Sequence, residues 1–293
     1  MRLSRLRDTW RSQGTLGSLQ SARDRWMGTR SSLARQAQTV TAGARALEVG
    51  GPSRHFRRRG MLPLYASMRT VDNINFSRQT LWSDGLRDGG PYAPEGVPVG
   101  IQLLREATDL RDIPDHYYDV VLSSHCLEHI ANPLRALQEW RRICRPSGHL
   151  CLVVPHRDRT FDWHRPVTSI EHLRSDALNN VEEDDDTHFE EVLRYHDLRR
   201  DPGARSAMEF QRRVADNWAI RGVHHHVFDL RTAVLLVSEA GWTPVAAEAR
   251  RPHDILILGQ SSTNTPAEYE PKVVFRGSPF RSDRRAPGVM FRK

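Results

Sequence analysis

Residues 45–56, RALEVGGPSRHF, decide the expected fold, because a short apolar run there meets a carboxylate and then two adjacent glycines. An apolar strand that runs into glycines at the first turn of a wound sheet is typical of a nucleotide-type site, since only glycine lets the backbone approach a ligand closely. The stretch does not match the G-x-G-x-x-G pattern of dinucleotide sites. The carboxylate of Glu48 favours a cationic or amino-bearing ligand over a pyrophosphate, which needs positive or dipolar contacts.

Outward from this stretch, apolar runs alternate with helical patterns along most of the chain. The alternation predicts an α/β fold with a doubly wound, mostly parallel sheet at residues 41–260. Residues 1–40 resemble an amphipathic helical extension, and residues 261–293 a basic tail. Between residues 157 and 222 the alternation stops, which predicts a helical insertion after the fifth strand, over the catalytic face. The strands expected after the first are MRTVDN (68–73), VGIQLL (99–104), YYDVVLSS (117–124), GHLCLVVP (148–155), TPVAAEA (243–249) and DILILG (254–259).

The formal net charge of +7 raises the question of a nucleic-acid partner, but the basic residues concentrate at the two ends of the chain. We therefore do not expect such a partner. The acidic run VEEDDD at residues 181–186 is expected to be a solvated face. The three cysteines show no CxxC spacing, and no segment has the apolar length of a signal peptide or a membrane span. These features predict a cytoplasmic protein with reduced cysteines.

The segment LEVGGPS resembles the first glycine-rich motif of class I, Rossmann-like, S-adenosylmethionine-dependent methyltransferases, and later segments follow in register with that family. The resemblance implies that Glu48, Gly50 and Gly51 bind the donor, S-adenosylmethionine, which is both cationic and amino-bearing. It also implies a seven-stranded sheet of order 3-2-1-4-5-7-6 whose last strand is antiparallel.

Three further segments carry the resemblance. In the family the second strand ends in an acid that holds the ribose hydroxyls, and MRTVDN supplies Asp72. The third motif places an acid beside the adenine, and EATDLRD supplies Asp109, with Leu110 next to it. SSHCLEHI resembles the segment after the fourth strand in the type 11 subfamily, where the backbone, here at Ser124, walls the methionine moiety.

The insertion, with PHRDRTFDWHRP at its start and HHHVFD at its end, resembles bacterial methyltransferases often associated with glycan and polysaccharide gene sets. This resemblance implies O-methylation of a sugar hydroxyl on a glycan or a glycosylated small molecule. Such a reaction needs a base, and His156 and His125 are the candidates because they directly follow the fifth and fourth strands. Arg159 and Arg165 are candidates to grip an acidic group of the acceptor, and His225 is a candidate to contact it.

Imidazole and carboxylate groups together also suit a divalent ion, Mg²⁺ or Mn²⁺, for which His188 and His225 are the candidate ligands. Such an ion would lower the pKa of the acceptor hydroxyl. Two other readings stay open, an RNA methyltransferase and a non-catalytic cofactor-binding partner in a glycan-assembly complex. The N-terminal segment could contact a membrane surface or a second subunit.

Overall fold

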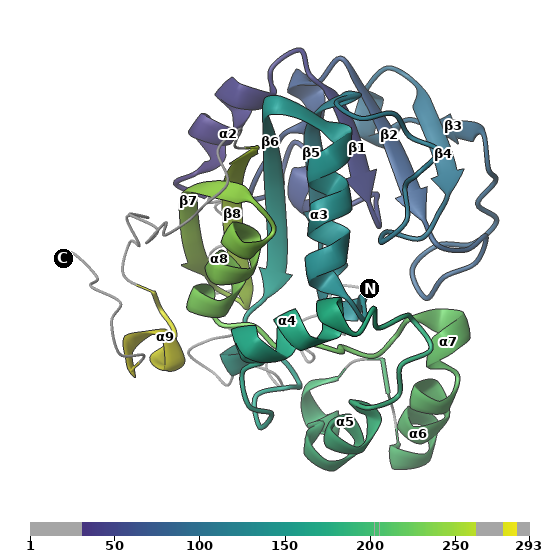
Figure 1. Ribbon diagram of the computed structural model, residues 1–293, viewed down its shortest axis with the longest axis vertical. Coiled ribbons are helices and arrows are strands. Elements are labelled where there is room, and N and C mark those ends of the chain that lie inside the picture. The colour runs from purple at the N-terminus through teal and green to yellow at the C-terminus, as the bar shows by residue number, and fades with distance from the viewer. Residues whose placement is uncertain (1–30, 202, 205, 262–277, 286–293) are drawn as a thin grey trace.

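The computed structural model describes residues 31–201, 203–204, 206–261 and 278–285, and it shows one central sheet with helices on both faces (Figure 1). Over these residues the sheet holds eight strands in the order β3-β4-β2-β1-β5-β6-β8-β7. The neighbouring pairs from β4 to β6 are parallel, whereas β3 and β8 run antiparallel to their neighbours. The strands are β1 (Arg45–Val49), β2 (Thr70–Asn75), β3 (Gly90–Tyr92), β4 (Gly100–Leu104), β5 (Tyr118–Ser124), β6 (Cys144–Pro155), β7 (Trp242–Arg250) and β8 (Asp254–Ser261).

The described sheet has one strand more than the seven that we expected. The additional strand is β3, a three-residue edge strand of sequence Gly-Pro-Tyr that pairs antiparallel with β4. Glycine and proline predict a turn, and only the pairing with β4 makes this segment extended. When β3 is set aside, the other strands neighbour one another as the expected order has them, with β8 antiparallel.

Both faces of the sheet are buried, because successive side chains of a strand point to opposite faces and enter different apolar clusters. In β1, Leu47 belongs to the cluster that contains α3 (Pro133–Ile143) and α8 (Leu230–Glu239). The neighbouring Ala46 belongs to the cluster that contains α2 (Ala34–Thr41). This double burial explains why the strands read as short continuous apolar runs in the sequence.

The expected insertion lies between β6 and α8. In Figure 1 its helices lie below the sheet, at the end toward which the parallel strands point. It also has an apolar cluster of its own, which includes Phe210, Val192 and Val223. Because the insertion covers the carboxyl ends of the strands, it can supply side chains to a site there. Its described helices are α4 (Ile170–Leu178), α5 (Phe189–Tyr195), α6 (Ala207–Ala215) and α7 (Asn217–Ile220).

Part of the N-terminal segment belongs to the main fold. Residues 1–30 of the expected extension lie outside the described residues. Helix α2 buries Ala34 and Ala37 in the cluster on its side of the sheet. Just before it, Ser31 donates a hydrogen bond to Glu248 of β7 (2.6 Å), which ties this segment to the edge strand of the sheet.

The basic tail that we expected at residues 261–293 is described only at Ser261 and at residues 278–285. There Phe280 is buried, and so is Asp283, which lies in the short helix α9 (Arg281–Arg285). This part of the tail therefore packs into the main domain. In the described part of the chain, no helix has the length and apolar character to cross a membrane.

Candidate active site

A pocket of about 210 Å³ lies where the carboxyl ends of β1, β2, β4 and β5 meet the insertion. Ligands of open α/β sheets bind at this edge. Strands β1, β2 and β5 end in residues that line the pocket, Arg105 lines it directly after β4, and the insertion adds two charged side chains. The residues that line the pocket include Gly50, Asn75, Glu106, His125, Glu183 and Arg221.

The two adjacent glycines are both required, but for different reasons. Gly50 lines the pocket with a positive φ of +79°, and an added Cβ would lie 2.8 Å from the Sγ atom of Cys126. Gly51 does not line the pocket, because its open side faces the carboxyl group of Glu48. A Cβ on Gly51 would lie 2.3 Å from the Cδ atom of Glu48. The absence of a side chain at Gly50 therefore leaves room in the pocket, whereas its absence at Gly51 leaves room for the buried side chain of Glu48 behind the turn.

Glu48 holds this turn from inside the protein. Its fully buried carboxyl group accepts hydrogen bonds from the backbone N–H of Ser53 (2.9 Å), the hydroxyl of Tyr65 (2.8 Å) and the hydroxyl of Tyr92 (2.5 Å). Burial raises the pKa of Glu48, and the hydrogen bonds from the two tyrosines oppose that rise. Since Glu48 does not line the pocket, the structure corrects the direct ligand contact that we expected for it.

The second strand continues three residues past Asp72, to Asn75. Asp72 lies in the middle of β2, where it accepts hydrogen bonds from the backbone N–H of Ile101 (2.8 Å) and the hydroxyl of Tyr118 (3.0 Å). It does not line the pocket, so the ribose contact expected of it is not available there. Asn75 ends the strand and lines the pocket instead. The sequence held a signal for this, because Ile74, a β-branched apolar residue typical of strands, follows Asp72 and Asn73.

The acid after β4 is also displaced by three residues. Asp109 is partly exposed and pairs with Arg111 (2.6 Å), and Leu110 is fully buried in the core, so neither residue lines the pocket. Glu106, two residues after the end of β4, does line it. Burial raises the pKa of Glu106, and the charge of Arg221 opposes this rise. Sequence reasoning missed Glu106 because it sought the acid farther from the strand end.

Arg221 joins the insertion to the pocket. Its guanidinium pairs with Glu106 (3.1 Å) and with Glu183, and it lies 5.0 Å from the ring centroid of Phe76. Glu183 belongs to the acidic run that we read as a solvated face, but its side chain is only 11% exposed and lines the pocket. Burial raises the pKa of Glu183 to about 7, with Arg221 opposing and Glu106 adding to the rise. The insertion thus closes the pocket with charged groups.

His125 faces the pocket directly after β5. Its backbone has a positive φ of 51°, and its Nε2 atom lies 2.8 Å from Oδ1 of Asp254. Burial alone would lower the pKa of His125, but the hydrogen bond and charge of Asp254 outweigh it and raise the pKa above the ordinary value. The neighbouring Ser124 also lines the pocket, and its hydroxyl contacts Nδ1 of His55 (2.8 Å). One wall of the pocket is therefore a histidine held by a buried carboxylate.

The chain is similar in sequence to known methyltransferases. Residues 69–152, from just before β2 into β6, match the protein family described as methyltransferase domain. A phosphatidylethanolamine N-methyltransferase from Cereibacter sphaeroides is 26% identical over 163 residues, which cover 48% of this chain and 72% of that protein. The chain is an S-adenosylmethionine-dependent methyltransferase. The ubiquinone/menaquinone biosynthesis C-methyltransferase UbiE from Vibrio vulnificus is 28% identical over 90 residues, which cover 31% of this chain and 32% of that protein.

Solved structures are also similar to the methyltransferase. A putative S-adenosylmethionine-dependent methyltransferase from Listeria monocytogenes is 15% identical, with 83% of this chain and 98% of that chain covered and a TM-score of 0.45. The 1,6-didemethyltoxoflavin-N1-methyltransferase from Burkholderia thailandensis is 14% identical, with 84% and 85% covered and a TM-score of 0.38.

The methyl donor is S-adenosylmethionine, and the pocket residues fit it. The donor carries a sulfonium cation, and the carboxyl groups of Glu106 and Glu183 line the pocket. The turn at Gly50 leaves open a space on the pocket wall that any larger residue would disturb. These features belong to this chain's own residues and do not rest on the relatives.

His156, our first candidate for the base, lies outside the pocket of the methyltransferase. It is fully buried, its Nε2–H donates to Asp283 (3.1 Å), and its Nδ1 accepts from the backbone N–H of Asp158 (3.1 Å). Its ring stacks on Phe280 at a centroid distance of 4.0 Å. The C-terminal segment covers the end of β6, which sequence spacing could not reveal. His156 therefore anchors that segment and has no access to an acceptor in the pocket.

The acceptor-binding candidates from the insertion do not line the pocket either. Arg165 is buried, and its guanidinium pairs with Asp162 (3.1 Å) and Glu191 (2.7 Å). Arg165 also donates to the backbone carbonyl of His225 (2.9 Å), so it holds the returning loop in place. His225 is fully buried, and Arg159, which is half-buried, lies away from the pocket lining. The metal-ligand candidate His188 lies in a separate cluster, described below.

Proposed function

We propose that the methyltransferase methylates a hydroxyl group and that His125 is its general base. The observation that carries this proposal is the position of His125, which lines the pocket while Asp254 holds its Nε2 atom at 2.8 Å. A carboxylate at Nε2 favours the tautomer with Nε2–H, which leaves the lone pair on Nδ1. That nitrogen lies 3.7 Å from Oε1 of the buried Glu128, beyond hydrogen-bond distance, so its lone pair is free to accept a proton.

The donor would lie along the ends of the strands. The glycine turn at Gly50 would pass closest to it, the side chain of Asn75 would contact the ribose hydroxyls, and Glu106 would accept a hydrogen bond from the exocyclic amine of the adenine. Asn75 and Glu106 thereby take the roles that we first assigned to Asp72 and Asp109. Their positions at the ends of β2 and β4 support this assignment.

The donor supplies a methyl group activated by its sulfonium. The acceptor oxygen would form its bond to the methyl carbon as the carbon–sulfur bond of the sulfonium breaks, which leaves neutral S-adenosylhomocysteine. Nδ1 of His125 would take the hydroxyl proton, and the carboxylate of Asp254 would stabilise the imidazolium that results. The imidazole is only 26% exposed, so little water competes for that proton. A general base of this kind contributes about 10²–10⁴-fold to the rate.

For the acceptor we favour a sugar hydroxyl on a glycan or a glycosylated small molecule. Trp82 supports this class, because its side chain lines the pocket and is nevertheless 63% exposed. An exposed aromatic ring beside a pocket offers a flat apolar surface on which the face of a sugar ring can stack. Trp163, which lies near the start of the insertion, donates to Asp197 (2.9 Å) and does not line the pocket.

An amine acceptor is the second candidate. The carboxyl group of Glu183 lines the same pocket and could hold a cationic head group, while Glu106 would contact the adenine of the donor. The relative from Cereibacter sphaeroides is, by its name, an N-methyltransferase of phosphatidylethanolamine. His125 could serve such a substrate as well, since an ammonium group must lose a proton before it accepts a methyl group.

One experiment separates these readings. The purified protein is incubated with isotope-labelled donor and three acceptor panels, namely nucleotide sugars with short glycans, phosphatidylethanolamine vesicles, and transfer RNA, and mass spectrometry locates the label. We expect label on a sugar hydroxyl, at a rate that His125→Gln lowers by about 10²–10⁴-fold. Label only on the amine or only on RNA would overturn the sugar assignment. Tight binding of S-adenosylhomocysteine without transfer to any panel would favour a non-catalytic role.

A further inference from the structure

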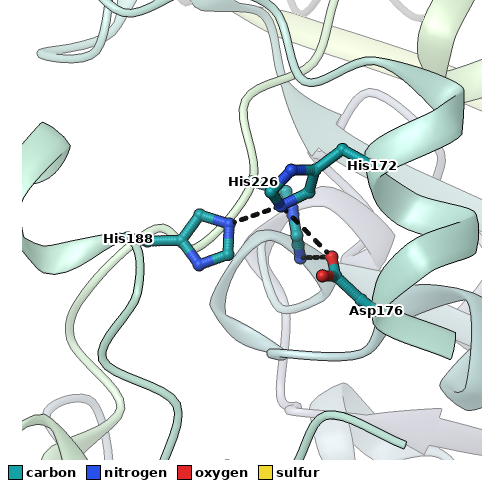
Figure 2. Close-up of side chains that lie close together, drawn as sticks. All are labelled: His172, Asp176, His188 and His226. Atoms are coloured by element: carbon teal, nitrogen blue, oxygen red, sulfur yellow. Dashed lines mark hydrogen bonds and ion pairs between the residues drawn. The ribbon is translucent and has the colours of Figure 1, made fainter. Parts of the chain in front are cut away.

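Four side chains of the insertion converge on one small space outside the pocket, as Figure 2 shows. His172 and Asp176 lie one turn apart on α4, His188 directly precedes α5, and His226 lies in the loop before α8. Each offers one ligand atom, and these atoms lie within 4.8 Å of one another. All four side chains except that of His172 are buried, and the exposed ring of His172 leaves a path to solvent.

The contacts inside this cluster are those of metal ligands brought together. The Nε2 atoms of His172 and His188 face each other at 2.9 Å, and Oδ2 of Asp176 lies 3.4 Å from Nε2 of His172. The ring of His226 lies beside this carboxylate: its Nε2 atom, which is bound to the backbone carbonyl of Ala131, is 3.6 Å from Oδ2 of Asp176. Two imidazole lone pairs at such a distance repel each other unless a proton or a cation lies between them.

Two buried atoms of the cluster have no hydrogen-bond partner. They are Oδ2 of Asp176, whose residue is 7% exposed, and Nδ1 of His226, whose residue is 1% exposed. Buried polar atoms without partners are rare, because they lose their water without compensation. A cation would satisfy both atoms at once.

Neighbouring groups fix the imidazoles in the tautomers that a metal needs. Nδ1 of His188 lies 3.0 Å from Oδ2 of Asp185, which leaves the Nε2 lone pair directed at His172. Nε2 of His226 donates to the backbone carbonyl of Ala131 (3.0 Å), which leaves the Nδ1 lone pair free to bind. Carboxylates and carbonyls on the far nitrogen of a histidine are the usual outer partners of metal sites.

We propose that His172, Asp176, His188 and His226 bind one Zn²⁺ ion. Imidazole nitrogens and carboxylate oxygens are both ligand types that Zn²⁺ binds, and four protein ligands match the four-coordinate, closed geometry of structural zinc sites. Mg²⁺ prefers oxygen ligands in an octahedron, so this set argues against the Mg²⁺ that we first considered. His225, the other ligand we expected, lies outside the set of four.

The ion would clamp the insertion together. It would tie α4 to the segment before α5 and to the loop before α8. Glu183 lies between the ligands Asp176 and His188 in sequence, and Arg221 lies shortly before His226, so the clamp would also fix the segments that carry both pocket-lining charges. None of the four ligands lines the pocket, so the role is structural. This proposal does not depend on the acceptor.

The test begins with the metal content of the purified full-length protein, measured by plasma mass spectrometry. We expect about one Zn²⁺ per chain in the unmodified protein and less than about a tenth of that in His188→Gln and Asp176→Asn. His164→Gln is the matched control, because His164 is an exposed histidine of the same insertion outside the cluster. It should retain a full equivalent of Zn²⁺.

A second measurement keeps the proposal open to refutation if a variant fails to fold. The unmodified protein is stripped with a chelator and titrated with Zn²⁺, Mg²⁺ and Mn²⁺ while heat and melting temperature are recorded. We expect stripping to lower the melting temperature by about 5 °C or more, and Zn²⁺ alone to restore it at a stoichiometry of one. No Zn²⁺ binding, restoration by Mg²⁺ or Mn²⁺ instead, or equal Zn²⁺ content in His188→Gln and His164→Gln would overturn the assignment.

Discussion

Replacing Gly50 with alanine should weaken donor binding, and the structure separates the cost into two parts. The first is backbone strain, because φ is +79° at Gly50 and a residue with a Cβ pays about 1–2 kcal/mol in the left-handed region. The second is steric, because the new Cβ would lie 2.8 Å from Sγ and 2.9 Å from Cβ of Cys126. Since both residues line the pocket, any relief of this contact moves a pocket wall.

Gly85→Ala is the matched control for this change. Gly85 has a similar φ of +68°, but an added Cβ would have no atom within 4 Å. The control should therefore show only the strain, as a fall in melting temperature of about 2–4 °C per kcal/mol. Gly50→Ala should in addition weaken the binding of S-adenosylhomocysteine by about tenfold or more, which is about 1.4 kcal/mol.

Isothermal titration calorimetry measures both affinities, and thermal unfolding measures both stabilities. Adding Cys126→Ala to Gly50→Ala should recover part of the lost affinity, because it removes the Sγ atom that the new Cβ meets most closely. If Gly50→Ala and Gly85→Ala leave the affinity equally unchanged, Gly50 is not part of the donor site. If Cys126→Ala recovers nothing, the steric part of the reasoning is wrong.

Three further predictions concern two other residues of the pocket and one of the C-terminal segment. The rate of methyl transfer should fall as the pH drops through the raised pKa of His125, because only the neutral imidazole accepts a proton. Asp254→Asn should move the resulting inflection of the pH–rate profile to lower pH, and an inflection that does not move would contradict the pairing of His125 with Asp254. Glu106→Ala should weaken S-adenosylhomocysteine binding by about tenfold, whereas Asp109→Ala should not, and calorimetry showing the reverse would restore our first assignment. Phe280→Ala should lower the free energy of unfolding in urea by about 3–5 kcal/mol and leave donor affinity unchanged. A loss of donor affinity in this variant would show that the C-terminal segment contributes to the pocket.

The sequence by itself determines where most of the strands and the glycine turn lie, because these features depend on the local pattern of residues. The apolar runs indicate where the strands lie, because both faces of the sheet are covered and most residues of the central strands must suit a buried surface. The pair of glycines after Val49 marks the pocket, since no other residue can occupy both positions. The short edge strand β3 could not be predicted in this way, because three residues are too few to show a period.

The identity of the site residues is decided by the tertiary structure. The length of the pairing between β2 and β4 decides whether Asp72 or Asn75 stands at the end of β2. That pairing extends to Asn75. His156 is withdrawn from the pocket by a segment more than a hundred residues away, through Asp283. Spacing along the chain predicts which strand end a residue follows, but it does not report which distant segment covers that end.

The histidine cluster shows the same limit most clearly. His172 and Asp176 have a helical spacing that a sequence can display, but His188 and His226 join them from other segments of the insertion. The acidic run between them looked like a solvated surface, yet Glu183 faces the pocket and Asp185 holds His188. Contacts between distant segments form only when the chain packs, because the free energy that brings these charges together comes from the burial of the apolar surface around them.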